Sequence, residues 1–388
     1  MRAAELSPDR LALGVDWAIL DDMHEARTYH RWQLGLGVLR ILLTAGYLAA
    51  LLATGAAARL RDLLAAWTTH WWLAVPAAVI VLAAGHLLLT LPLGWLSGFE
   101  LPRRYGLSHE TLGQWLRDRG KAGLIGGGLA TAGALVVYGL LRSTPWWWLW
   151  AAAAFAVGGA VLAFAMPICL VPLFYRLTPL PEGDLRSRLL RLAERARVPA
   201  VGVWIADQSR RSRTANAAVT GLGRTRRILV FDTLVSRFEP EEVEAVLAHE
   251  LGHHVAGDVW RGLAVQGAVT LAALWVADRA LSAAAGPLGL SGPSDIAGLP
   301  LLGLVTMTVS LVALPVINSW SRWVETRADD FALKLTGTPG PFIGAMERLA
   351  DLNLSERDPH FLKELFLHSH PSVGRRIARA RTGVWSGS

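Results

Sequence analysis

The sequence is poor in cysteine, with one, Cys169, among 388 residues. A single thiol cannot close an intramolecular disulfide, so a small scaffold held together by disulfides is excluded. Cys169 lies inside an apolar run, and we therefore expect it to be a buried and unreactive thiol.

Charged side chains are also scarce. They make up 18% of the chain, whereas hydrophobic residues make up 53% and the mean hydropathy is +0.36. The apolar residues gather in six long runs, near residues 36–58, 73–95, 123–141, 147–170, 262–277 and 299–317. Runs of this kind predict membrane-spanning helices, so the lipid bilayer is an expected partner. The fifth run is short, since Asp278 and Arg279 follow it, and we expect that helix to be tilted or only partly exposed to lipid.

Acidic residues are outnumbered by basic ones, 31 against 38, and the formal net charge is +7. Most basic residues precede the first run, separate the second from the third, or follow the fourth. The positive-inside rule then predicts a multi-pass protein of the cell membrane with both termini and the segment after the fourth run in the cytoplasm. Because topology explains the charge, nucleic acid is not an expected partner. We expect no cleavable signal peptide, because the first 33 residues are rich in acids and bases.

The largest polar segment, residues 176–260, predicts a small α+β unit. An amphipathic helix is expected within 179–198, and three short β-type runs follow at 201–207, 214–221 and 226–232. Residues 239–258 are predicted to form one helix, with Pro240 in its first turn and Gly257 at its end. A further helix is expected over 321–337.

The 239–258 helix contains the pattern His-Glu-x-x-His at residues 249–253. Positions i and i+4 share one helix face, so His249 and His253 can hold one zinc ion. Glu250 can accept a proton from a water that attacks a carbonyl. His254 points about 100° away from His253 around the helix, and we interpret it as a neighbouring polar residue. The alternative for the motif is a surface helix with two solvated histidines.

A catalytic zinc needs a third protein ligand. Glu325 is the best candidate, and Asp329, four residues later on the same face, is placed to hold a ligand histidine by its second nitrogen. Asp330 is an alternative acid with a less favourable spacing. The alternative is that Glu325 and Asp329 are exposed acids on an ordinary amphipathic helix and have no part in a metal site.

At this point the sequence resembles a known family. The motifs HELGHH, ETRAD and HPSVGRRI occur in the order found in the type I CAAX prenyl endopeptidases, which are integral-membrane zinc metalloproteases. The stretches GFELPRRYGLS, PLFYRLTPLPEGDLRSRL and NAAVTGLGRTRRILVFDTLV are similar to that family as well, so the resemblance runs from about residue 95 to 380.

The resemblance implies a fold and a set of roles. It implies a polytopic membrane protein with a cytoplasmic, zincin-like α+β protease domain. With the six apolar runs, the expected fold is mainly α with about six spans, fewer than the eukaryotic members of the family have. The spans of similar proteins form the wall of a water-containing chamber. His86 and Gln266, two polar residues inside the spans, could face such a chamber, but we interpret them as hydrogen-bonded packing residues. The resemblance implies one Zn²⁺ per chain, bound by His249, His253 and Glu325, with Glu250 as general base and acid. It also implies that Asn216 and Ala217 lie on an edge strand that pairs with the substrate backbone. His370 and Arg376 would face the zinc and stabilise the oxyanion or the substrate. Each of three residues has a purely structural alternative to its implied role: Asn216 as a turn residue, His370 as the cap of a loop, and Arg376 as a solvated charge on a helix.

The substrate class transfers less directly than the chemistry. The eukaryotic members cleave prenylated Cys-a-a-X ends, whereas this composition is typical of bacteria, which generally lack protein prenylation. We therefore expect the partner to be a peptide or membrane-protein substrate. The expected division is 1–175 with four spans, 176–260 with edge strands and the His-Glu-x-x-His helix, 261–320 with two spans, and 321–388 with the third ligand.

Two other classes of function remain open. A site-2-type intramembrane protease would place the motif inside a span and take its third ligand from a Leu-Asp-Gly context, which this sequence lacks. A non-catalytic, peptide-binding membrane protein would have no need of the base Glu250.

Overall fold

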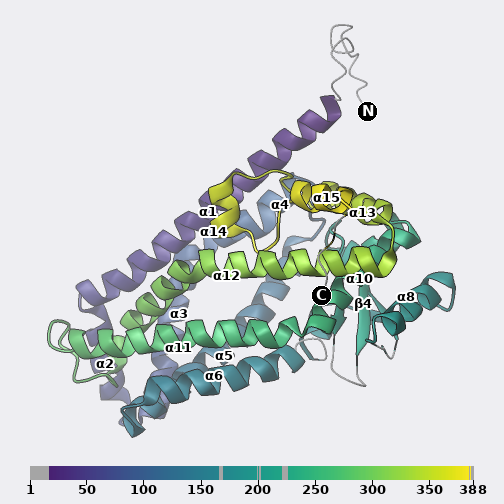
Figure 1. Cartoon of the computed structure of the whole chain (residues 1–388). Helices are drawn as coiled ribbons and strands as arrows, with labels where there is room; N and C mark the ends of the chain where they lie inside the picture. Colours follow the sequence, from purple (N-terminus) through teal and green to yellow (C-terminus); the bar gives the residue numbers. More distant parts are fainter. Residues whose placement is uncertain are drawn as a thin grey trace.

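The structure is a computed structural model that describes residues 17–165, 169–198, 200, 202–220, 226–383 and 385. Long helices lie side by side, and a small sheet with shorter helices occupies one end of them (Figure 1). The long helices are α1 (Trp17–Ala53), α3 (Trp71–Trp95), α5 (Leu112–Ser143), α6 (Trp147–Ala165), α11 (Asp258–Ala284) and α12 (Leu299–Thr336). The shorter ones are α2 (Ala56–Trp67), α4 (Leu101–Arg104), α7 (Val171–Phe174), α8 (Asp184–Arg195), α9 (Asp232–Arg237), α10 (Pro240–Ala256), α13 (Pro339–Leu352), α14 (Phe361–Leu367) and α15 (Val373–Arg381), with single turns η2 (Leu96–Glu100), η4 (Gln208–Arg210) and η6 (Ile296–Gly298).

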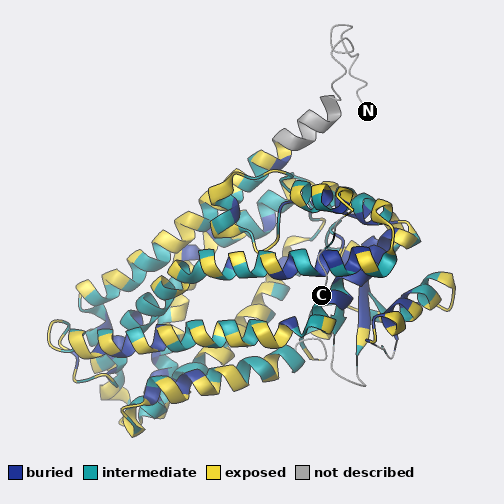
Figure 2. Cartoon of the chain, viewed as in Figure 1, coloured by how far each residue is buried: buried dark blue, intermediate teal, exposed yellow. Residues whose placement is uncertain are grey.

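Six of the described helices are long and apolar enough to cross a membrane, as expected. Between 0 and 22% of each apolar stretch is buried in the protein, and exposed residues alternate with half-buried ones along these helices (Figure 2). In water such surfaces would be unstable, but in a bilayer they contact lipid. The prediction of a buried Cys169 is wrong: the thiol is exposed, because Cys169 lies beyond the end of α6 at Ala165 and before α7, outside the packed helices.

The ends of the spans differ in detail from the sequence-based boundaries. The first span ends at Ala53, because Gly55 adopts a left-handed conformation, with φ of 68°, and starts α2. The fifth span is not short but covers 27 residues of α11. It accommodates Asp278 because the indole Nε1 of Trp147 donates to Oδ1 of this buried carboxylate at 2.8 Å. The free-energy cost of burying a charged group is much smaller when that group has hydrogen-bond partners than when it has none.

The packing residues that the sequence suggested inside the spans have hydrogen-bond partners. The ring Nε2 of His86 on α3 lies 2.9 Å from the hydroxyl of Thr44 on α1. Gln266 on α11 is exposed and donates weakly, at 3.4 Å, to Thr270 one turn later. Both side chains therefore have local partners within or between spanning helices.

The sheet has four strands in the order β1-β2-β4-β3. They are β1 (Leu177–Pro179), β2 (Val203–Ala206), β3 (Ala217–Thr220) and β4 (Arg227–Phe231). Strands β2 and β4 are parallel, whereas the other two pairs are antiparallel. The sequence predicted β2, β3 and β4 but not the three-residue β1. The order leaves β3 at one edge of the sheet, as the resemblance implied.

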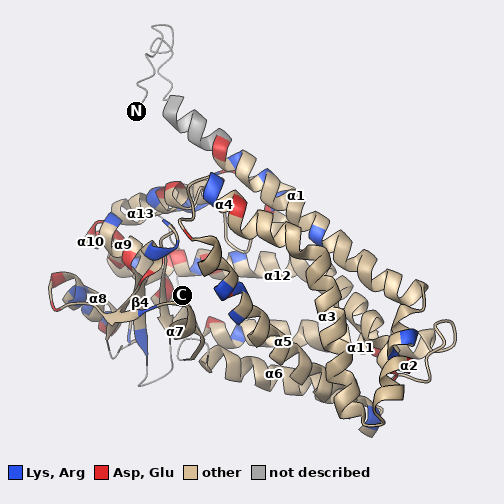
Figure 3. Cartoon of the chain, turned by 180° about the vertical axis from the view of Figure 1, so that it is seen from behind, with Lys and Arg blue, Asp and Glu red and all other residues tan. Residues whose placement is uncertain are grey.

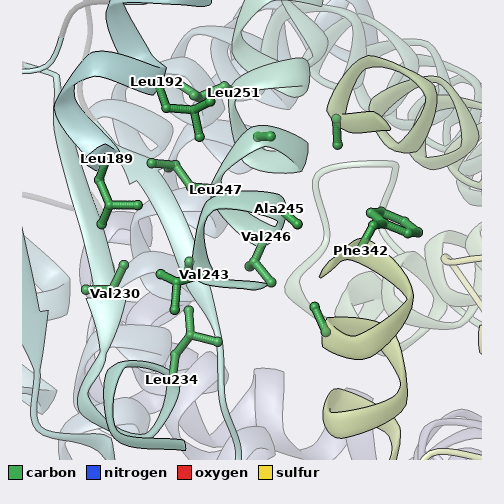
Figure 4. Packing of buried hydrophobic residues seen from close by; sticks show 14 of the residues in the cluster. Leu189, Leu192, Val230, Leu234, Val243, Ala245, Val246, Leu247, Leu251 and Phe342 are labelled. Atoms are coloured by element: carbon green, nitrogen blue, oxygen red, sulfur yellow. The ribbon is translucent and has the colours of Figure 1, made fainter. Parts of the chain in front are cut away.

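Helix α10 packs between the sheet and α12. Its residues Leu247 and Leu251 are fully buried in the core that also includes Val230 and Leu189 (Figure 4). Burying a leucine contributes about 1.5–3 kcal/mol, so this face holds the helix firmly. On the α12 side, a Cβ built at Gly252 would lie 3.2 Å from the Cα of Ala328, so glycine permits the close approach of the two helices.

Helix α12 is one uninterrupted element of 38 residues. The expectation of a separate helix over 321–337 is therefore wrong, because nothing after Pro315 breaks the helix before Gly337, which adopts φ of 75°. The sixth span and the predicted third metal ligand thus belong to the same helix, which runs through the expected boundary at residue 320.

Candidate metal centre and active site

Three predicted ligands meet where α10 approaches α12. The Nε2 atoms of His249 and His253 lie 3.2 Å apart, and they lie 3.2 Å and 3.6 Å from the two carboxylate oxygens of Glu325. All three ligand atoms fall within 4.8 Å of one another. Oε2 of Glu325 is buried, and the ring nitrogens Nε2 of His249 and Nδ1 of His370 lie 3.2 Å and 2.8 Å from it. Two imidazoles and a carboxylate that converge in this way fit a divalent metal such as zinc.

Each ligand histidine has an acid on its other ring nitrogen. Nδ1 of His249 lies 2.8 Å from Oδ1 of Asp329, which is the pairing expected from the sequence. Nδ1 of His253 lies 3.0 Å from Oδ2 of Asp258, a pairing the sequence analysis did not predict. The available signal was the acid directly after Gly257, whose left-handed backbone ends α10 and turns the chain into α11. Such carboxylates fix the ring orientation of a metal-binding histidine.

The protonation of His249 depends on its acidic neighbours. Burial lowers the pKa of His249, but hydrogen bonds and charge interactions with Asp329 and Glu325 outweigh burial and raise the pKa to about 9. A histidine must be deprotonated at the nitrogen that binds a metal. Protons and the metal ion therefore compete for this side chain.

Arg376 is part of the same network. Its guanidinium donates to both oxygens of Asp329, at 2.9 Å and 2.6 Å, and one of its nitrogens lies 3.4 Å from Nδ1 of His249. Its side chain is 12% exposed, so the alternative of a solvated helix charge is wrong. Asp330 pairs with Arg379 instead and takes no part in holding His249.

His370 lies on the other side of Glu325. Its Nδ1 is 2.8 Å from Oε2 of Glu325, and its side chain is 61% exposed. The loop that carries it leads into α15, where the hydroxyl of Ser372 caps the first turn.

Helix α12 fixes this loop through two residues that the sequence analysis missed. Arg322 donates to the carbonyl oxygens of Glu364 and His368, both at 2.7 Å, and Asn318 donates to that of Phe366 at 2.7 Å. Residues 318, 322, 325 and 329 are spaced by four, three and four, so they share one face of the helix. The same helix face thus carries the predicted third ligand and the groups that hold α14 and the His370 loop.

Glu250 and Asn216 complete the site. A cavity of ≈ 540 Å³ is lined by Asn216, His249, Glu250, His370 and Arg376, among others. It also contains His30 and His368, which the sequence did not indicate. Ala217 is buried and is not part of this lining, but its neighbour Asn216 is exposed and accepts from the N–H of Ala217 at 2.9 Å.

The backbone of β3 alternates between the sheet and its free edge. The N–H of Phe231 donates to the carbonyl of Asn216, so the pairs 216–231 and 218–229 exchange the ladder hydrogen bonds with β4. The polar groups of Ala217 and Val219 consequently point to the open side. The carbonyl of Val219 lies 2.7 Å from Nε2 of His254, which confirms that His254 lies outside the metal site.

Comparisons with known proteins agree with this geometry. A family model described as Peptidase family M48 matches residues 179–384, and one described as CAAX prenyl protease N-terminal, five membrane helices, matches residues 6–176. The chain belongs to peptidase family M48. The resemblance to the CAAX prenyl endopeptidases is thereby confirmed. Within the described part of 17–165, four helices qualify as spans, and the 12-residue α2 is an additional, shorter helix.

Individual relatives support the same family. The chain is 32% identical over 335 residues to the uncharacterized metalloprotease YhfN of Bacillus subtilis, covering 85% of this chain and 78% of that one. It is 30% identical to a CAAX prenyl protease 1 homolog of Arabidopsis thaliana, covering 74% and 68%. The crystal structure of S. mikatae Ste24p has the same fold, with a TM-score of 0.80 over 97% of this chain and 91% of that one at 22% identity.

The M48 protein is therefore a membrane metalloendopeptidase. This class of function excludes the two alternatives left open by the sequence, a site-2-type protease and a non-catalytic binder.

Proposed function

We propose that the M48 protein is a zinc endopeptidase in which His249, His253 and Glu325 hold the metal and Glu250 is the general base. The observation that carries the proposal is the convergence of the three ligand atoms within 4.8 Å, beside a cavity that Glu250 also lines. Zinc bound there would polarise the scissile carbonyl and lower the pKa of the attacking water. The carboxylate of Glu250 would accept a proton from that water and donate it to the departing amine.

The edge strand β3 is the proposed substrate platform. The outward C=O of Ala217 and the outward N–H of Val219 can pair with an extended peptide, since β-strand addition uses such free groups. The N–H of Ala217, which donates to Oδ1 of Asn216 at 2.9 Å, can join them by exchanging this partner for a substrate carbonyl. Asn216 stands at the end of this edge and lines the cavity that contains Glu250. A peptide bound along β3 would thus lead into the metal site.

The roles of His370 and Arg376 follow from their contacts. We assign His370, exposed beside Glu325, as a donor to the oxygen of the scissile carbonyl, where charge develops during attack. Arg376 donates its hydrogen bonds to Asp329, which in turn contacts Nδ1 of His249. We therefore assign Arg376 as a positioning residue for His249.

We further propose that the site lies on the cytoplasmic side of the cell membrane and acts on membrane proteins or hydrophobic peptides. The Arg-rich segments gather at the end of the helices that carries the sheet, and basic residues are visible there (Figure 3). The division into 1–175, 176–260, 261–320 and 321–388 stays part of this proposal.

The deciding experiment replaces Glu250 by Gln in the purified full-length protein. The amide keeps the size of the side chain but removes the base, so cleavage of a quenched peptide should fall by ~10²–10⁴ while the zinc content stays at one per chain. Glu325→Ala should instead lose the zinc. Glu241→Gln, on the exposed face of the same helix, is the matched control and should retain both properties. Cleavage by Glu250→Gln at the parent rate would refute the proposed mechanism.

A further inference from the structure

The charge-free part of α5 shows where the membrane surface crosses this helix. Residues 122–141 contain no charged side chain, and Lys121 and Arg142 stand directly before and after them. A helix of this length covers about 30 Å, the thickness of the hydrocarbon core of a bilayer. Lys121 therefore lies at the boundary between hydrocarbon and lipid head groups. Arg117, one turn earlier on the same helix face, lies within the head-group layer.

A basic cavity of ≈ 230 Å³ lies at this level, between α5 and the chain that follows the fourth span. Three separate segments contribute to it: α5, the chain around α7, and the connection from β2 to β3. Basic residues on the part of α5 near α7 are visible in Figure 3. The cations that line the cavity are Arg117, Lys121, Arg176, Arg210 and Arg211, and the acid among them is Asp118.

Part of this charge is neutralised within the protein. Asp118 pairs with Arg211 at 2.8 Å and with Lys121 at 3.4 Å, and Asp207 pairs with Arg210 at 3.1 Å. Counting Glu110, which interacts electrostatically with Arg210 and Arg211, the cavity still has more cations than acids around it.

The uncompensated charge belongs to two arginines. In the described part of the chain, no carboxylate lies within 4.0 Å of the guanidinium of Arg117 or Arg176. Both side chains are exposed, and they reach the cavity from different segments. The positive-inside rule explains why basic residues lie on this side of the membrane, but it does not require unpaired arginines from separate segments to converge on one cavity.

The surroundings favour an amphiphilic anion over a soluble one. Leu124, which is 80% exposed, lies three residues after Lys121 on the same face of α5 and points into the hydrocarbon layer. Leu173, which is 49% exposed, lines the cavity itself. The guanidinium fork matches the oxygens of a phosphate group, and basic pockets between spanning helices bind anionic lipid head groups.

We propose that this cavity binds the phosphate head group of an anionic phospholipid, held by Arg117 and Arg176, with its acyl chains along Leu173 and Leu124. The lipid would join the third span to the β2–β3 connection, since Arg210 and Arg211 line the same cavity. It would therefore tie the sheet that carries the β3 edge to the membrane surface.

The test measures lipid binding to the detergent-purified full-length protein by native mass spectrometry. Phosphatidylglycerol is titrated against the parent protein and against the double variant Arg117→Gln/Arg176→Gln, with phosphatidylcholine and inorganic phosphate as separate arms. Because each basic residue near a membrane surface contributes about five-fold in affinity, the double variant should bind phosphatidylglycerol about 30-fold more weakly. The parent should prefer phosphatidylglycerol to both other ligands.

A matched variant separates a specific site from a general effect of charge. Arg191→Gln/Arg381→Gln removes two exposed arginines away from this cavity and should leave phosphatidylglycerol binding unchanged. An equal loss in both double variants, or equal binding of phosphatidylcholine, would overturn the proposal. Inorganic phosphate binding as tightly as the lipid would also overturn it, because it would show a site for soluble anions. Unchanged thermal unfolding of each variant confirms that the fold is intact.

Discussion

Nδ1 of His253 lies 3.0 Å from Oδ2 of Asp258, which begins the fifth membrane-spanning helix. A proposed metal ligand on α10 is thus oriented by a residue of α11. Asp258 also pairs with Arg327 on α12 at 2.7 Å, so three helices meet at this carboxylate.

We expect Asp258→Asn to weaken zinc binding by about 10–100-fold, the usual effect of removing a carboxylate that orients a ligand histidine. Competition with a chromophoric chelator measures this affinity. Asp207→Asn, an exchange of the same kind outside the site, is the control. Zinc affinity unchanged in Asp258→Asn would mean that His253 is oriented by its backbone alone.

Arg322 should matter for turnover and not for metal content. Arg322→Ala removes hydrogen bonds to Glu364 in α14 and to His368 in the loop that follows, and it should lower kcat by about 10-fold or more, since a small displacement of a catalytic group is costly. Arg322→Lys keeps the charge and can restore one hydrogen bond, so it should recover part of the rate. Zinc content and KM for a peptide should stay close to the parent values. A loss of zinc in both variants would show that Arg322 supports α12 and not the loop.

The free edge of β3 allows a backbone test of substrate binding. The N–H of Ala217 points to the open side, where it donates to Oδ1 of Asn216, so Ala217→Pro removes this local bond and a proposed substrate contact without breaking the ladder to β4. One hydrogen bond contributes about 0.5–1.5 kcal/mol, and we expect kcat/KM to fall by about 2–13-fold, mainly through KM. Ala218→Pro, which removes a ladder hydrogen bond, should destabilise the sheet instead. Equal effects of the two variants on thermal unfolding would contradict this register.

The proposed topology is open to cysteine labelling, with Cys169 first replaced by Ser. Cysteines at Ser143 and Ser294 should react with a membrane-impermeant reagent added outside intact cells, because they lie at the end of the helices away from the sheet. A cysteine at Ser209, in the β2–β3 connection, should react after the cells are opened. Labelling at position 209 in intact cells would reverse the orientation and with it the cytoplasmic site.

The sequence was most informative where local chemistry determines local structure. Pro240 and Gly257 indicated the two ends of α10, and the His-Glu-x-x-His spacing indicated two histidines on one face of it. It was least informative for contacts between distant segments that use the backbone. Arg322 recognises two carbonyl oxygens, which every residue carries, so no residue type marks its partners. Strand β1 escaped prediction because three residues that include Pro179 carry no alternation.

Burial was the other property that the sequence could not supply. Asp278 was expected to lie at the end of a span, but it lies inside α11, because Trp147 on α6 provides a donor. Cys169 showed the reverse, since an apolar neighbourhood in the sequence did not bury it. In both cases burial depends on which distant segment packs against the residue, and such a contact leaves no pattern in the neighbouring residues.

Helix α12 is one continuous helix, about 57 Å along its path, that crosses the membrane and carries Glu325 beyond its apolar half. A spanning helix adjusts its tilt to the thickness of the bilayer around it. We therefore expect bilayer thickness to influence where Glu325 lies against the two histidines of α10, and so to act on the proposed metal site.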